Sequence, residues 1–82
     1  MTSNYYIVRN EPADSWQLCT HMGMPCMARS TMAATMATAE KLATVRANKV
    51  SWPMPVFHVT DENVPAVWNG SIDRGGNWID RA

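Results

Sequence analysis

The chain lacks an excess of charge of either sign, because its seven basic and seven acidic residues cancel. A chain without net charge creates no long-range attraction toward phosphate backbones or anionic lipids, so nucleic acid is a poor candidate partner. It also lacks an apolar run near the roughly 20 residues that a membrane span needs. Residues 1–9 have neither the basic nor the apolar section of a signal peptide. We therefore expect a cytoplasmic protein that binds neither nucleic acid nor membranes.

Cysteine is scarce as well. The two that are present, Cys19 and Cys26, are too few for the disulfide framework of a small secreted domain. We expect both thiols to be reduced, and a bridge between them is the alternative.

The chain also lacks the motifs of catalysis. The Gly75-Gly76 pair has neither the lysine nor the helix start of a phosphate-binding loop. Ser71, Asp73 and His58 have the side chains of a hydrolase triad, but they have no nucleophile elbow and no oxyanion-hole candidate. We therefore expect no enzymatic activity and no cofactor, with an enzyme site assembled across a dimer as the remaining enzymatic alternative.

The N-terminal part predicts a β-hairpin. Residues 5–9 are β-branched and aromatic, and residues 15–20 alternate apolar with polar side chains, as strands do. Residues 10–14 between them contain Asn, Pro and Asp, which supply turn geometry. Four apolar side chains then share one face of the hairpin: Tyr5, Ile7, Trp16 and Leu18.

A helix is predicted from Met32 to about Asn48, since this run is rich in helix-forming residues and has neither Gly nor Pro. Ser30 or Thr31 is the expected N-cap. The spacing of apolar residues predicts a buried face made of Met32, Met36, Ala39, Leu42 and Ala43, with Glu40, Lys41 and Thr44 pointing elsewhere.

The remaining segments complete an α+β domain. The prolines in 51–55 predict a rigid connector, 56–60 a third strand, and 64–68 a fourth strand that Pro65 confines to a sheet edge. The expected fold is a small antiparallel sheet in the order β-β-α-β-β with one helix packed on one face. Residues 1–68 form this single domain, and 69–82 form a C-terminal tail that docks on it or stays free.

One helix covers only one face of such a sheet, so the other face stays open to a partner. A chain of 82 residues also has little core of its own. We therefore expect a homodimer as well, in which the edge strand and the open face are buried against a second copy.

The sharpest chemical feature is a cluster of soft side chains within nine residues, made of Cys19, His21, Met22, Met24, Cys26 and Met27. Thiolates, thioethers and imidazole suit Cu(I), and the candidate ligands are Cys19, His21, Met24 and Cys26. Structural zinc would need Cys19, His21 and Cys26 with His58 as the fourth ligand. Methionine-rich loops also serve as adaptable contact surfaces, and we favour that interpretation here.

Together these features predict a non-catalytic accessory protein that acts by protein–protein contact. It is of the kind that phages and mobile elements encode to inhibit a host protein, and the partner would be such a host or cellular protein. The candidate contact residues are exposed methionines and tryptophans, namely Met22, Met24, Trp52, Trp68 and Trp78. The alternative function is a small Cu(I)-binding protein that uses the soft cluster.

The order of elements is similar to that of a family of small uncharacterised bacterial and phage domains. The resemblance covers residues 5–60 and lies in packing residues, which are Tyr6, Val8, Trp16, Leu18, Thr31, Ala39, Leu42-Ala43 and 56–59. The chain departs from the family pattern at Thr35, where alanine is usual, and has no Asp-Gly turn after the third strand. The resemblance implies the β-β-α-β fold and no particular activity.

Overall fold

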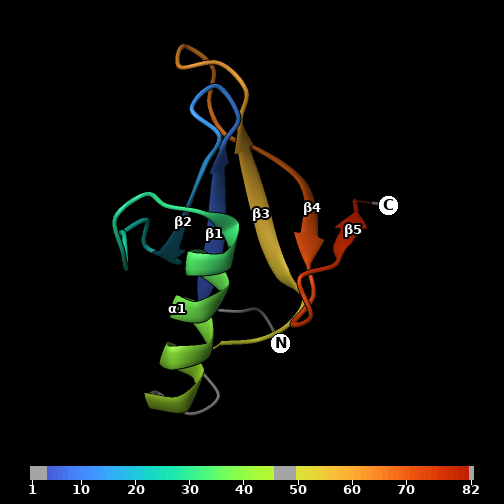
Figure 1. Ribbon diagram of the computed structural model, residues 1–82. Coiled ribbons are helices and arrows are strands. Elements are labelled where there is room, and N and C mark those ends of the chain that lie inside the picture. The colour runs from blue at the N-terminus through green and yellow to red at the C-terminus, as the bar shows by residue number, and fades with distance from the viewer. Residues whose placement is uncertain (1–3, 46–49, 82) are drawn as a thin grey trace.

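The computed structural model describes residues 4–45 and 50–81. Figure 1 shows one helix lying across part of a twisted sheet. The elements, in chain order, are β1 (Tyr5–Asn10), β2 (Ser15–Thr20), α1 (Met32–Val45), β3 (Met54–Val59), β4 (Val67–Ile72) and β5 (Trp78–Asp80).

The α+β class and the order β-β-α-β-β are confirmed, but the sheet is mixed and has five strands. The strands lie side by side in the order β2-β1-β3-β4-β5. β1 and β3 are parallel, and the other neighbours are antiparallel. The helix supplies the crossover that a parallel pair requires. The expected all-antiparallel sheet is therefore wrong at this central pair.

The N-terminal hairpin forms as predicted. In the register of β1 and β2, Ile7 lies opposite Leu18 and Arg9 opposite Trp16, so the predicted apolar face is confirmed. The turn is held by Asn10, whose side-chain oxygen accepts a hydrogen bond from the backbone N–H of Ala13 at 3.1 Å. This is the local bond that makes asparagine a turn residue.

The helix begins where predicted, because Thr31 caps it. The Thr31 hydroxyl oxygen accepts the backbone N–H of Ala34 at 3.1 Å. Ser30, the other cap candidate, instead pairs with Trp16. The structure describes α1 to Val45, and the predicted continuation over 46–48 lies outside the described residues.

The helix face that contacts the core is close to the predicted one. Ala39 is fully buried, and Met32, Met36 and Leu42 pack against the core around it. Thr35 is also fully buried, which the apolar pattern did not predict. Its hydroxyl donates to the backbone oxygen of Thr31 at 3.0 Å, and this bond satisfies the buried polar group.

The core lies between the helix and one face of the sheet. Alternate residues of β1 and β3 point into it, together with one residue each from β2, α1 and β4. Its buried members are Tyr5, Ile7, Leu18, Ala39, Met54, Val56 and Ile72.

The C-terminal part differs most from the expectation. β3 begins at Met54, and the fourth strand is 67–72 rather than 64–68. The predicted domain boundary at residue 68 therefore falls inside β4. Residues 78–80 of the predicted tail form β5, which pairs with β4 and becomes the edge of the sheet. Among the described residues, no helix is long and apolar enough to cross a membrane.

Candidate functional site: an aromatic groove on the open sheet face

The sheet face opposite the helix carries aromatic and apolar side chains. Because side chains alternate along a strand, Tyr6 and Val8 point away from the core residues Tyr5 and Ile7. Pro55 and Phe57 of β3 point the same way, since Met54 and Val56 between them are fully buried. We call this side of the sheet the open face.

Strand register brings two further residues of β4 to the open face. Trp68 lies opposite Phe57, and Ser71 lies opposite Pro55. A β-bulge between these pairs lets Gly70 lie opposite Val56 on the core side. The open face thus draws side chains from three adjacent strands, β1, β3 and β4.

These side chains line a groove of about 650 Å³, which we call the aromatic groove. Its floor is formed by Tyr6, Val8, Pro55, Phe57, Trp68 and Ser71. Tyr5, His21, Pro53 and Ala66 complete its wall. This volume and mostly apolar lining are typical of binding sites.

The rings of the groove are held in defined orientations. Tyr6 and Phe57 meet edge to face, with ring centres 5.2 Å apart. The indole N–H of Trp68 donates to the backbone oxygen of Gly70 at 2.7 Å. The guanidinium of Arg81 lies 4.9 Å from the centre of the Trp68 ring. The hydrogen bond and the cation–π contact therefore fix the orientation of the Trp68 ring, although the residue is 41% exposed.

Among the described residues, the groove has no acidic side chain in its lining. Its polar side chains Tyr6, His21 and Ser71 can each donate a hydrogen bond, and each can also accept one. The pKa of Tyr6 is raised from its ordinary value of 10.0, first by burial and then by the nearby Cys19. The Tyr6 hydroxyl is therefore neutral and able to donate at physiological pH.

The two thiols of the soft cluster lie on different sides of the sheet layer. Cys19 pairs with Pro25, and the backbone N–H of Cys26 donates to the oxygen of Leu18, so Cys26 is adjacent to Leu18. Cys26 accordingly packs against the core, whereas Cys19 lies on the same face as its partner Tyr6. Both cysteines are free thiols, so the alternative of a Cys19–Cys26 bridge is wrong.

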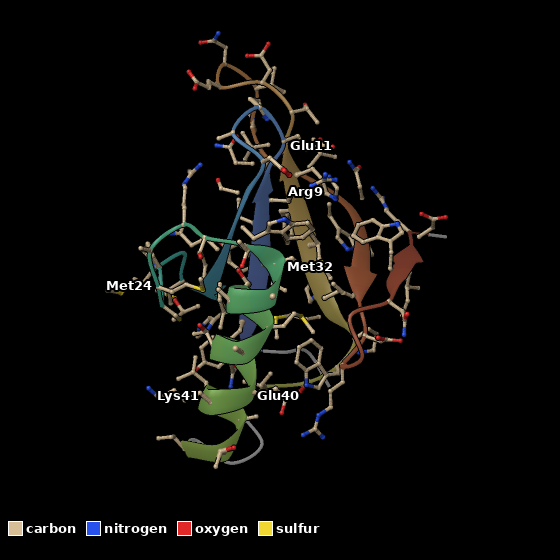
Figure 2. The ribbon with its side chains drawn as sticks, in the orientation of Figure 1. Arg9, Glu11, Met24, Met32, Glu40 and Lys41 are labelled. Atoms are coloured by element: carbon tan, nitrogen blue, oxygen red, sulfur yellow. The ribbon has the colours of Figure 1, made fainter. Side chains whose placement is uncertain are left out.

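The histidine and cysteine members of the soft cluster are not gathered as a metal site. Within the described ranges, no three His, Cys, Asp or Glu side chains come together as a metal site. The pKa of Cys19 is raised from its ordinary value of 9.0 by burial and by Cys26, although Arg29 lowers it. A protonated thiol is a weak metal ligand. Figure 2 labels Met24 in the loop that follows β2, at the left edge of the view.

The candidate contact residues fall into separate groups. Met22 and Met24 are exposed and lie next to His21, a wall residue of the groove. Trp68 belongs to the groove. Trp52 packs against the core, and Trp78 lies on the helix side of the sheet, with its ring edge-to-face against His58 at 5.3 Å. The five candidates therefore do not form one patch.

The residues of the hypothetical triad are not brought together. His58 follows Met54 and Val56 on the core side of β3, and Ser71 lies on the open face. His58 is buried, with its Nδ1 3.5 Å from a carboxylate oxygen of Glu11. Asp73 accepts hydrogen bonds from Asn77 in the β4–β5 turn.

Sequence reasoning missed Tyr6 and Phe57, the central rings of the groove. The signal was present in the alternation of each strand, because each ring follows or precedes a core residue. No family model, curated protein or solved structure matches the chain. The resemblance to small bacterial and phage domains thus stays a prediction.

Proposed function

We propose that this chain is a non-catalytic accessory domain that binds a segment of another protein in its aromatic groove. The supporting observation is the groove itself, in which three ordered aromatic rings remain accessible on the face that the helix leaves uncovered. Exposed, oriented aromatic side chains are the commonest energetic centres of protein interfaces. The loop with Met22 and Met24 extends this surface beyond His21.

The same proposal includes the role of the chain. A small domain with a preformed contact surface, and with no catalytic triad assembled among its described residues, suits an inhibitor that is encoded by a phage or mobile element and occupies a surface of a host protein. The cell that expresses the chain is therefore the source in which the partner is sought.

Two tryptophans provide a matched test of the surface. Trp68 and Trp78 are both 41% exposed, but only Trp68 lines the groove. Tagged wild type, Trp68→Ala and Trp78→Ala are used for quantitative capture from a lysate of the native host. The protein that is identified is then purified, and its affinity for each variant is measured by calorimetry.

We expect Trp68→Ala to weaken binding by tenfold or more, since a central interface tryptophan contributes about 2 kcal/mol or more. The Trp78→Ala variant should bind the partner with the affinity of the wild type. Replacing Met22 and Met24 by Ser should weaken binding less, because these side chains lie beside the groove. Equal affinity of the Trp68→Ala variant and the wild type would contradict the proposal, provided that circular dichroism shows both to be folded.

A further inference from the structure

The aromatic groove offers hydrogen-bond donors beside its rings. Among the described residues that line it none is a carboxylate, and the hydroxyls of Tyr6 and Ser71 and the imidazole of His21 can each donate. The Trp68 indole N–H is already used by Gly70. An occupant that presents backbone carbonyl oxygens can therefore accept hydrogen bonds from the groove.

A polyproline II segment has this property. Proline has no backbone N–H, and the extended helix exposes its carbonyl oxygens all along its length. Its pyrrolidine rings pack on aromatic surfaces, and aromatic-lined grooves are the usual receptors for such segments. In this chain, Pro53 and Pro55 already lie among the rings of the groove.

The rim of the groove adds a preference for charge. Arg81 lies over the Trp68 ring, and within the described residues no carboxylate is placed to form an ion pair with it. His21 is the other ionisable side chain of basic character at the groove. The chain has zero net charge, yet Arg81 and His21 border this groove and none of the described residues that line it is acidic.

Other acidic side chains lie away from the groove or already accept hydrogen bonds, as Asp80 does from the indole N–H of Trp78 on the helix side. Glu11 and Asp14 pair with Arg9, which stacks on Trp16 on the helix side. Glu40 pairs with Arg74. Asp61 and Glu62 are in the loop between β3 and β4, which projects beyond the end of the sheet in Figure 1.

We infer that the occupant of the aromatic groove is an extended, proline-rich segment that carries acidic residues beside its prolines. This inference rests on the proposed function and names the chemistry of the partner segment. The proline rings pack on Tyr6, Phe57 and Trp68, the backbone carbonyls accept from the groove hydroxyls, and a carboxylate meets Arg81.

The probe is a synthetic polyproline peptide of about eight residues, or ~25 Å at 3.1 Å per residue, with aspartate at both ends. One comparison peptide has lysine in place of aspartate, and another has the same aspartates around glycine and serine. Oligothymidylate tests the alternative that the rings stack on single-stranded nucleic acid. Binding is followed by amide and indole chemical shifts and by calorimetry on the full chain.

We expect the aspartate-flanked polyproline peptide to shift the resonances of Tyr6, Phe57 and the Trp68 indole, and to bind more tightly than either comparison peptide. Arg81→Glu should weaken it about tenfold and strengthen the lysine-flanked peptide, because the sign of the rim charge is reversed. Lys41→Glu, the same change of net charge on the exposed face of α1, is the matched control and should change neither affinity.

The inference is overturned if the glycine–serine peptide binds as well as the polyproline peptide, or if Arg81→Glu and Lys41→Glu have the same effect. It is also overturned if oligothymidylate, and none of the peptides, moves the groove resonances. If none of these peptides binds but capture of a host protein still depends on Trp68, only the inference of a proline-rich segment is wrong. If the Trp68→Ala variant captures the host protein as well as the wild type does, the proposed function itself is wrong.

Discussion

At the scale of single residues, Gly70 is the position that the architecture constrains most. A Cβ atom at Gly70 would overlap the Trp78 ring and the backbone oxygen of Ile79. The Trp78 ring occupies the space beside this glycine and meets the His58 ring edge to face. The absence of a side chain at Gly70 is therefore what lets β5 dock on β4.

We predict that Gly70→Ala lowers the free energy of unfolding by about 1–3 kcal/mol, the usual cost of overpacking. Gly75→Ala is the control, because a Cβ there would approach only side-chain atoms, the nearest being Asn77 Nδ2 at 3.2 Å. Chemical denaturation monitored by tryptophan fluorescence measures both. Equal midpoints for the two variants would show that β5 is able to move away from β4 without cost.

At the scale of elements, the fold was predictable where the signal is local. The hairpin and the helix follow from alternation, turn residues and a threonine cap, and all of these lie within a few positions of the element that they define. The parallel pairing of β1 with β3 depends on contacts between residues about 49 apart in sequence, such as Ile7 and Val56, and no local pattern encodes them.

β4 and β5 were missed for a different reason. Asn69-Gly70-Ser71 has the composition of a turn, and glycine normally weakens a strand. Here Gly70 lies in a strand because the Trp78 ring takes the place that a side chain at position 70 would need. This contact depends on the tertiary structure and cannot be read from the local sequence. The groove was missed with these elements, since Trp68 meets Phe57 only once the register of β4 is known.

The helix provides the second prediction. Ala39 is fully buried against the sheet, whereas Ala37 on the same helix is exposed. Ala39→Leu should destabilise the fold by about 1–3 kcal/mol, because the helix approaches the sheet too closely to admit a larger side chain. Ala37→Leu introduces the same residue and should change stability by less than about 0.5 kcal/mol. Thermal melts of the two variants compare them directly, and a lower midpoint for Ala37→Leu would show that the opposite helix face is the packed one.

At the scale of the whole molecule, acid stability depends on carboxylates at the β4–β5 turn and on α1. Glu40 receives two hydrogen bonds from Arg74, at 2.8 and 2.9 Å, which join α1 to this turn. These bonds lower the pKa of Glu40 from its ordinary value of 4.5. Hydrogen bonds from the backbone and side chain of Asn77 lower the pKa of Asp73 from its ordinary value of 3.8.

A carboxylate with a lowered pKa binds its proton less tightly in the folded state than in the unfolded state. Its stabilisation is therefore present above its ordinary pKa and is lost as the pH falls through the folded value. We predict that the melting temperature of the wild type falls below about pH 4.5, and that Glu40→Gln and Asp73→Asn each make this fall shallower. Glu62→Gln, in an exposed loop, is the control. Superimposable curves for all four proteins would contradict the prediction.

The last prediction concerns assembly. The edge of the sheet on this side is β5 and not the predicted strand 64–68. The outer side of β2 is occupied, because Trp16 and Ser30 exchange backbone hydrogen bonds of 2.8 and 2.9 Å. β5 is the other end of the sheet, and its Ile79 is 42% exposed. Such an edge is a template for another strand.

The sequence of β5 is complementary to itself. Antiparallel pairing of two copies around Ile79 would place Trp78 opposite Asp80 and Asn77 opposite Arg81, so no like charges would meet and the sheets would join into one. We predict a dimer at micromolar concentration, measured by sedimentation equilibrium over a concentration series. Ile79→Lys should give a mass of 9.2 kDa throughout, because a charged edge residue opposes strand addition. Val45→Lys, at an exposed apolar position of α1, should leave the dimer intact, and a wild type that stays at 9.2 kDa into the high micromolar range would show that β5 is not an interface between copies.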